Sequence, residues 1–226
     1  MLKINELIST SEGRIFIAGI ILLLGYITSA LSMYLFSIEN ANNIFGMTAA
    51  NIFFGRAAGI SYGYSANFSD LIIVVYNILI ETILVMIIYP LFVFSWNRSV
   101  KIKFLQDMFI KIKEQKEKYQ NLFNKYGKYG LFIFVWFPFW MTGPVVGAII
   151  GFLIGIKHYQ TIFIVVFGTS LATLIWTYFL KEMILLLNQI SSNGALIILV
   201  LIILVGVVLK VFGNNNKKKK NKDIDV

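Results

Sequence analysis

An uncharged run of 26 residues, from Leu131 to Ile156, places the strongest constraint on how this chain can fold. Such a run is typical of a segment within the hydrocarbon of a membrane. It is nevertheless interrupted by Pro138 and Pro144 around Thr142-Gly143, and proline removes a backbone donor and clashes with the preceding helical turn. We therefore expect the helix to break there. Irregular backbone at membrane depth is tolerated only where protein or a wet cavity covers it, so the break predicts a buried site.

Glycines recur every four residues after this break, at Gly143, Gly147, Gly151 and Gly155. A second series lies in residues 44–68, a segment rich in small and polar residues: Gly55, Gly59 and Gly63. This spacing would leave bare backbone along one helix face, which lets a second helix pack closely. Two interrupted segments in the two halves of one chain are typical of transporters built from inverted repeats.

The composition indicates an integral membrane protein. Hydrophobic residues make up 58% of the 226 residues and the mean hydropathy is +0.78, and this apolar fraction is well above that of soluble domains. The chain has no cysteine and one histidine, His158, which excludes disulfides, thiol catalysis and histidine-rich metal sites. It also contains no phosphate-binding loop, HExxH pattern or GxSxG pattern. We therefore expect no cofactor, no metal ion and no enzyme activity.

Four apolar runs are long enough to cross a bilayer as helices: residues 15–36, 71–96, 161–187 and 195–212. Between the second and third runs, residues 98–128 carry nine Lys and Arg against three acidic residues, with apolar residues near helical spacing. That pattern predicts an amphipathic helix on the cytoplasmic face, followed by a turn at Tyr126–Gly130 into the central run. Residues 1–212 would form a single transmembrane domain, and the basic tail 213–226 would be disordered.

The charge distribution predicts how the central run meets the membrane. The basic excess in residues 98–128 and 210–226 accounts for the whole net charge of +9, and basic segments beside apolar spans mark the cytoplasmic side. Two clear spans lie between these segments and already return the chain to that side. The central run, residues 131–156, must therefore enter and leave from the cytoplasm as a re-entrant hairpin.

The same interpretation makes residues 44–68 a hairpin that enters from outside, with a cytoplasmic N-terminus. The predicted fold is an all-α integral membrane protein with about four transmembrane helices and two re-entrant helical hairpins in inverted repeat. The basic segments would bind membrane lipids rather than nucleic acid. The predicted location is the plasma membrane of a prokaryote, with the C-terminus in the cytoplasm.

Arg56 is the strongest single candidate for a functional residue. An ionised side chain inside a membrane segment costs about 2.5–3.5 kcal/mol on insertion scales, so it needs a partner or water. Glu81, in the next span, is the expected partner, and the two would face one another across a midplane cavity that binds an anionic headgroup or relays protons. In the alternative interpretation, Arg56 extends to the outer interface and Glu81 has only a structural role.

Four residues form the expected tip of the central hairpin, where unpaired amides and carbonyls could bind a ligand: Pro138, Thr142, Gly143 and Pro144. The alternative is a plain turn that only permits close packing. Nearby aromatic residues would line the site and stack on cations or face lipid: Phe134, Trp136, Phe137 and Trp140. We expect His158 in a cytoplasmic loop and Asn77 in contacts between helices.

Two motifs resemble those of the small multidrug export protein family, distant relatives of the DedA (VTT-domain) membrane proteins. Lys125-Tyr126-Gly127 precedes an apolar run and then Pro138-Phe139-Trp140-Met141-Thr142-Gly143, which resembles the family pattern P-L-P-G-T-G with Trp140 and Met141 as replacements. Residues 54–61 resemble E-L-R-G-A-I-P through Arg56, without the glutamate and the later proline. The resemblance implies two re-entrant hairpins and membrane transport.

The sequence therefore supports more than one function. The first is a secondary transporter that exports small amphipathic or cationic compounds by alternating access around the hairpin tips. The second, implied by the DedA relationship, is a translocase or scramblase for a phosphate-bearing lipid, with Arg56 on the phosphate. A third is a membrane scaffold without transport activity that dimerises through its glycine faces, and the sequence leaves homo-oligomerisation open.

Overall fold

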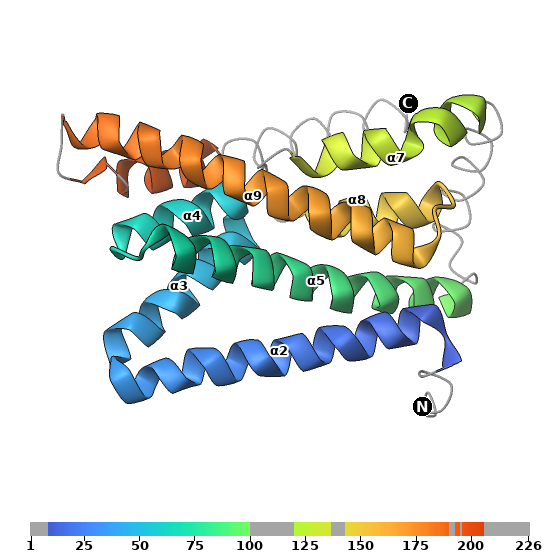
Figure 1. The fold of residues 1–226 in the computed structure, drawn as a ribbon, viewed down its shortest axis with the longest axis horizontal. Coiled ribbons are helices and arrows are strands. Elements are labelled where there is room, and N and C mark those ends of the chain that lie inside the picture. Colours follow the sequence, from blue (N-terminus) through green and yellow to red (C-terminus); the bar gives the residue numbers. More distant parts are fainter. Residues whose placement is uncertain (1–8, 100–119, 137–142, 190–192, 195, 206–226) are drawn as a thin grey trace, which may run out of the picture.

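The computed structural model describes residues 9–99, 120–136, 143–189, 193–194 and 196–205, and all regular structure within these ranges is helical. Two long helices pack along a third: α2 (Ser11–Phe36) and α9 (His158–Asn188) both contact α5 (Asp70–Ser99). Two pairs of shorter helices complete the bundle (Figure 1): α3 (Ile38–Phe54) with α4 (Arg56–Ser65), and α7 (Gln120–Trp136) with α8 (Gly143–Leu153). The prediction of an all-α fold is confirmed.

Helices α2, α5 and α9 are long and apolar enough to span a membrane, with mean hydropathies of 2.2, 2.7 and 1.9. A helix of 26 residues rises about 39 Å, more than the roughly 30 Å of a hydrocarbon core. Large apolar side chains remain exposed on all three, including Leu24, Leu71 and Phe163. The predicted spans 15–36, 71–96 and 161–187 are confirmed as long apolar helices. The described part of the fourth is a shorter helix, Leu196–Val205, and the rest of residues 195–212 and the tail 213–226 lie outside the described ranges.

Helices α3 and α4 fold back on one another around Gly55. This residue has a φ of 89°, a left-handed conformation that glycine adopts without strain. The two helices are antiparallel, because Gly59 lies against Asn51 near the turn while Gly46 lies against Tyr62 near the other end. The chain therefore reverses direction between Phe54 and Arg56, inside the bundle rather than at its surface.

Helix α3 begins earlier than the sequence pattern predicts. Residues 38–43, which lie outside the predicted segment 44–68, form its first turns, because the Ser37 side chain accepts a hydrogen bond from the Asn40 amide at 3.2 Å. Glu39 in the first turn adds a favourable interaction with the helix dipole. The segment predicted at residues 44–68 is therefore extended at its N-terminal end.

Helices α7 and α8 form the second antiparallel pair. A Cβ atom on Gly147 would lie 2.6 Å from Val135, and one on Gly151 would lie 3.0 Å from Leu131. Helix α8 thus packs antiparallel to α7, and the two helices are so close that the contact positions on α8 must be glycine. The connecting residues 137–142, which include the predicted tip residues Pro138 and Thr142 and the aromatic residues Phe137 and Trp140, lie outside the described ranges.

The predicted turn at Tyr126–Gly130 is wrong. Helix α7 continues without interruption from Gln120 to Trp136, although glycine costs about 1 kcal/mol in a helix interior. Leu131 and Val135 are almost fully buried, and their packing against α8 and α9 favours one continuous helix. The end of the predicted amphipathic segment 98–128 and the start of the predicted hairpin 131–156 therefore belong to the same helix, and residues 100–119 lie outside the described ranges.

The two glycine series divide between packing and turns. Four of the glycines contact neighbouring helices so closely that a Cβ atom would meet another side chain: Gly59, Gly63, Gly147 and Gly151. Gly55 and Gly155 were expected on the same helix faces, but both lie outside the helices. Helix α8 ends at Leu153, and Gly155 has a φ of 82° in the turn toward α9. The four-residue spacing of glycines in the sequence therefore includes positions in turns as well as positions on helix faces.

The buried apolar residues form two clusters that meet near the middle of α5. One cluster contains Ile44, Ile60 and Ile83, together with the C-terminal half of α9. The other contains Val85 and Val135, together with the N-terminal half of α9. Glu81 lies on α5 close to the level where the two clusters meet.

Candidate binding site at the centre of the bundle

Arg56 and Glu81 form a buried ion pair with two hydrogen bonds. Arg56 Nε donates to Glu81 Oε1 at 3.2 Å and Nη2 donates to Oε2 at 3.0 Å, and the two side chains are 2% and 5% exposed. Arg56 is the first residue of α4, so the turn at Gly55 determines its position. Paired donors on a carboxylate fix both distance and orientation. The partnership predicted from the sequence is thus a direct contact rather than a pair across a cavity, and Arg56 does not extend to an interface.

Two asparagines extend the polar centre around the pair. Asn51 Nδ2 donates to Asn77 Oδ1 at 2.7 Å, and Asn77 Nδ2 donates to the Ile73 carbonyl oxygen at 2.7 Å. Both side chains are buried, and Asn51 also interacts with the Glu81 carboxylate. Asn77 therefore makes a contact between helices, as expected. Gly59 packs against both asparagines, which allows α4 to approach them.

Two polar contacts fix how α9 lies along α5. At one end Lys181 Nζ lies 2.6 Å from Asp70 Oδ2, and at the other the Tyr89 hydroxyl lies 2.7 Å from His158 Nδ1. The helices are therefore antiparallel, with Glu81 between the two contacts. Glu81 lies eleven residues from Asp70 and eight residues from Tyr89. The same numbers of residues, counted along α9 from Lys181 and from His158, lead to residues 170 and 166, so residues 166–170 lie level with the ion pair. His158 is the first residue of α9, not a loop residue as predicted.

The C-terminal end of α7 lies at the same level. A Cβ atom on Gly168 would lie 2.7 Å from Val135 Cγ2, one residue before the end of the helix. The indole of Trp176 donates a hydrogen bond to the carbonyl oxygen of Trp136 at 3.2 Å, which fixes the last residue of α7 against α9. Phe134, by contrast, is 41% exposed on the outside of the bundle.

The N-terminus of α8 lies there too. Helix α8 is antiparallel to α9, with Gly151 against Thr161. Gly143 lies eight residues before Gly151, and Thr169 lies eight residues after Thr161, so Gly143 and Thr169 are at the same level. Gly143 and Pro144 are the first two residues of α8, where the missing donor of proline has no helical partner to lose. The two short helix pairs thus occupy opposite halves of the molecule in Figure 1, and both end near its centre. The positive ends of the α4 and α8 dipoles meet there.

Several buried polar atoms at this centre have no hydrogen-bond partner within the described ranges: Arg56 Nη1, Ser61 Oγ, Trp136 Nε1, Thr169 Oγ1 and Thr173 Oγ1. They come from α4, α7 and α9 and lie within about two helical turns of the ion pair. A buried donor left unsatisfied costs about 1–3 kcal/mol, so these atoms favour a polar ligand or water. The described residues contain no group of three His, Asp or Glu side chains suited to a metal ion. Among the described residues, the site therefore offers one ion pair and several donors without a partner.

The hydroxyl residues of this site were missed by sequence reasoning. The available signal was the spacing of Thr161, Thr169, Thr173 and Thr177, which places all four on one face of α9. Hydroxyls in apolar helices usually bond a carbonyl of the preceding turn, as Thr177 does to Thr173 at 2.8 Å. Only the structure distinguishes Thr169 and Thr173, whose hydroxyls make no such bond.

Comparison with known proteins identifies one family. No curated protein and no solved structure matches the chain, and the relationship to the DedA proteins stays an expectation. The sequence pattern of one family matches residues 56–175, which cover more than half of the chain and extend from the first residue of α4 into α9. The matched region contains Arg56, Glu81 and Thr169. The chain belongs to the family described as putative small multi-drug export proteins.

Proposed function

We propose that this protein is a membrane transporter that exports small amphipathic or cationic compounds through a site at the level of Arg56 and Glu81. One observation carries the proposal: a buried ion pair lies where two short helix pairs end, near polar atoms that have no partner among the described residues. Ionisable residues at such depth mark substrate or proton pathways. The description of the family agrees with export.

In this proposal, α3–α4 and α7–α8 are re-entrant hairpins that enter the bilayer from opposite sides. The lengths of their second arms support the placement, because α4 and α8 have 10 and 11 residues. A second arm of that length rises about 15–16 Å, which is half of a hydrocarbon core of roughly 30 Å. The ion pair would then lie near the midplane. Each hairpin precedes a long apolar helix, as in an inverted repeat.

The two proposed repeats supply different chemistry at matching positions. Glu81 lies eleven residues after the first residue of α5, and Thr169 lies the same distance after the first residue of α9. Arg56 begins α4, and Gly143 begins α8. One half therefore contributes two charges, while the other contributes a hydroxyl and a helix N-terminus. This asymmetry suits a substrate with one charged group and one neutral polar group.

The charges at the two ends of the bundle support an orientation. The end where α9 begins carries Arg14, Lys128 and Lys157 against Glu12, while the other end carries Glu39, Asp70 and Glu182 against Lys181. The positive-inside rule then assigns the first end to the cytoplasm. With a last span over residues 195–212 the C-terminus would be cytoplasmic as well, in the plasma membrane of a prokaryote.

The proposed cycle begins from an occluded state, because an apolar cluster lies on each side of the ion pair. A cationic substrate would compete with Arg56 for the Glu81 carboxylate, and a proton on Glu81 would weaken the same contact. Either event frees Arg56 to move with α4. Movement of one hairpin at a time would open the site to one side and then to the other.

Efflux of a fluorescent cationic dye from cells tests the proposal. Glu81→Gln and Arg56→Gln should each abolish efflux, because the pair is the charged part of the site. Asp70→Asn is the matched control, since it removes a carboxylate from an exposed ion pair at the end of the same helix. Normal efflux by both central variants at equal protein levels would refute the proposal.

Lipid translocation is the second candidate, favoured by Arg56 Nη1, which has no hydrogen-bond partner among the described residues and could donate to a phosphate oxygen. Purified protein in vesicles separates the two functions. Movement of a labelled phospholipid between leaflets without dye transport would favour the translocase. Dye transport without lipid movement would favour the exporter.

A further inference from the structure

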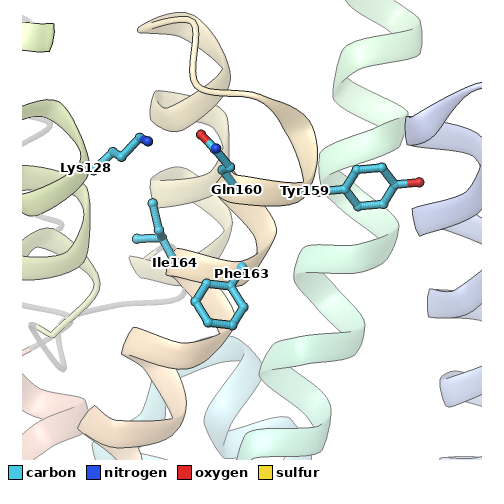
Figure 2. A pocket seen from close by; sticks show the side chains of 5 residues that line it. All are labelled: Lys128, Tyr159, Gln160, Phe163 and Ile164. Carbon is cyan, nitrogen blue, oxygen red and sulfur yellow. The ribbon is translucent and has the colours of Figure 1, made fainter.

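Helices α7 and α9 enclose an open groove of about 370 Å³ near the end of the bundle where α9 begins, away from the central ion pair. Its lining consists of Lys128 on α7 and four residues of α9: Tyr159, Gln160, Phe163 and Ile164. Figure 2 shows the ends of the Lys128 and Gln160 side chains pointing toward one another above Phe163 and Ile164, while the Tyr159 ring points away. None of the described residues that line the groove is acidic. It is polar and positive at one end and apolar at the other.

The depth of the groove matches the boundary of the hydrocarbon. Lys128 lies eight residues before Trp136, and Gln160 lies nine residues before Thr169, which places both about 12–13 Å from the central level. If that level is the midplane, as in the proposed function, these two side chains lie near the edge of a core about 30 Å thick. Phe163 lies about 9 Å from the midplane by the same count. A phosphate at the polar end would then be at headgroup depth.

The apolar end continues as an aromatic wall toward the midplane. Phe163 and Phe167 are 69% and 53% exposed, and their rings stack with centroids 5.9 Å apart. Phe167 also stacks on Phe132 of α7 at 6.3 Å. The wall therefore connects both helices that line the groove, and it faces outward, where an acyl chain would lie.

We propose that this groove is a binding site for an anionic phospholipid of the adjacent leaflet. Lys128 and Gln160 hold its phosphate, and one acyl chain lies along Phe163 and Phe167. The charge of Lys128, which no carboxylate among the described lining residues offsets, and the depth of both polar groups select an anionic headgroup. Because the groove joins α7 to α9, a bound lipid would hold the second helix pair against the bundle. The inference uses the bilayer placement of the proposed function but not its transport cycle.

Lipid-dependent thermal stability of the purified full-length protein tests the site. Titration with phosphatidylglycerol in neutral detergent should raise the melting temperature more than phosphatidylcholine does. Lys128→Gln should weaken the apparent affinity for phosphatidylglycerol about fivefold, the effect of one lysine on an anionic headgroup. Gln160→Glu, which adds a negative charge beside Lys128, should weaken it as well. Lys157→Gln is the matched control, because it removes one positive charge at the same end, beside a different pocket.

Each other outcome would overturn the proposal in a distinct way. Equal loss of affinity in the Lys128 and Lys157 variants would mean a general surface charge effect. Equal stabilisation by phosphatidylcholine would remove the anionic selectivity, and equal stabilisation by glycerol phosphate would mean an anion site without a lipid. Glu81→Gln should keep the lipid response, so failure of the transport proposal and failure of this one are separate results.

Discussion

Removal of one member of the Arg56–Glu81 pair should destabilise the protein more than removal of both. The side chains are 2% and 5% exposed and share two hydrogen bonds of 3.0 and 3.2 Å. Either single substitution leaves the partner charge buried without a counter-ion, which costs about 3–5 kcal/mol. In Glu81→Gln the amide oxygen can still accept one hydrogen bond, so we expect the lower end of that range.

The double variant Arg56→Gln/Glu81→Gln leaves no buried charge. Its loss of stability should therefore be smaller than that of Arg56→Gln alone, so the coupling energy of the cycle should exceed the cost of Glu81→Gln, about 3 kcal/mol. Denaturant unfolding of the purified protein in detergent, followed by circular dichroism, gives the four free energies. Additive single effects within about 0.5 kcal/mol would refute the inference that the two charges stabilise one another.

An exposed ion pair on the same helix provides the control. Asp70 and Lys181 lie 2.6 Å apart, closer than the central pair, but their side chains are 52% and 41% exposed. Solvent screens such a pair, so its cycle should give much weaker coupling despite the shorter distance. Equal coupling in the two cycles would mean that burial is not the source of the central effect. The double variant also separates stability from function, because it should be folded yet unable to export the dye.

Three further predictions concern packing, binding and topology. Gly59→Ala should destabilise the protein by about 1–3 kcal/mol because the new methyl group would meet Asn51 and Asn77, whereas Gly25→Ala, with nothing within 4 Å, should leave the melting temperature unchanged or raise it. Thr169→Val should keep or raise the melting temperature yet weaken substrate affinity by about threefold to tenfold, the value of one hydrogen bond; an unchanged concentration dependence of efflux would exclude Thr169 from the site. Because the chain has no cysteine, single cysteines report topology without background: an impermeant reagent should label Glu39→Cys but not Lys157→Cys in intact cells, and the reverse pattern would contradict the proposed orientation.

The sequence alone predicted the central pair because charge inside an apolar run is rare and needs a partner. Arg56 and Glu81 are the clearest such residues, and they meet directly. The long helices followed from their apolar length in the same way. Helix ends were harder to predict. Glu39 and its neighbours lie outside the predicted segment 44–68 but form the capped start of α3, and Gly127 and Gly130 were predicted in a turn but lie within α7. Thr169 and Thr173 could not be predicted, because only their missing hydrogen bonds distinguish them from other hydroxyls in α9.

The location of both charges on neighbouring helices of one half matters for the proposed cycle. Arg56 lies on α4 and Glu81 on α5, which follow one another in the chain and pack together. Movement of α7, α8 and α9 relative to that unit would not pull the charges apart, so it avoids the cost of a lone charge in hydrocarbon. Separation of the pair would instead require a competitor at Glu81, a cation or a proton, and would displace α4 at the turn of Gly55. The hydroxyls of Thr169 and Thr173 lie on the other half and would approach or leave a bound substrate as α9 moves. The affinity for the substrate would therefore depend on which side of the membrane the site faces.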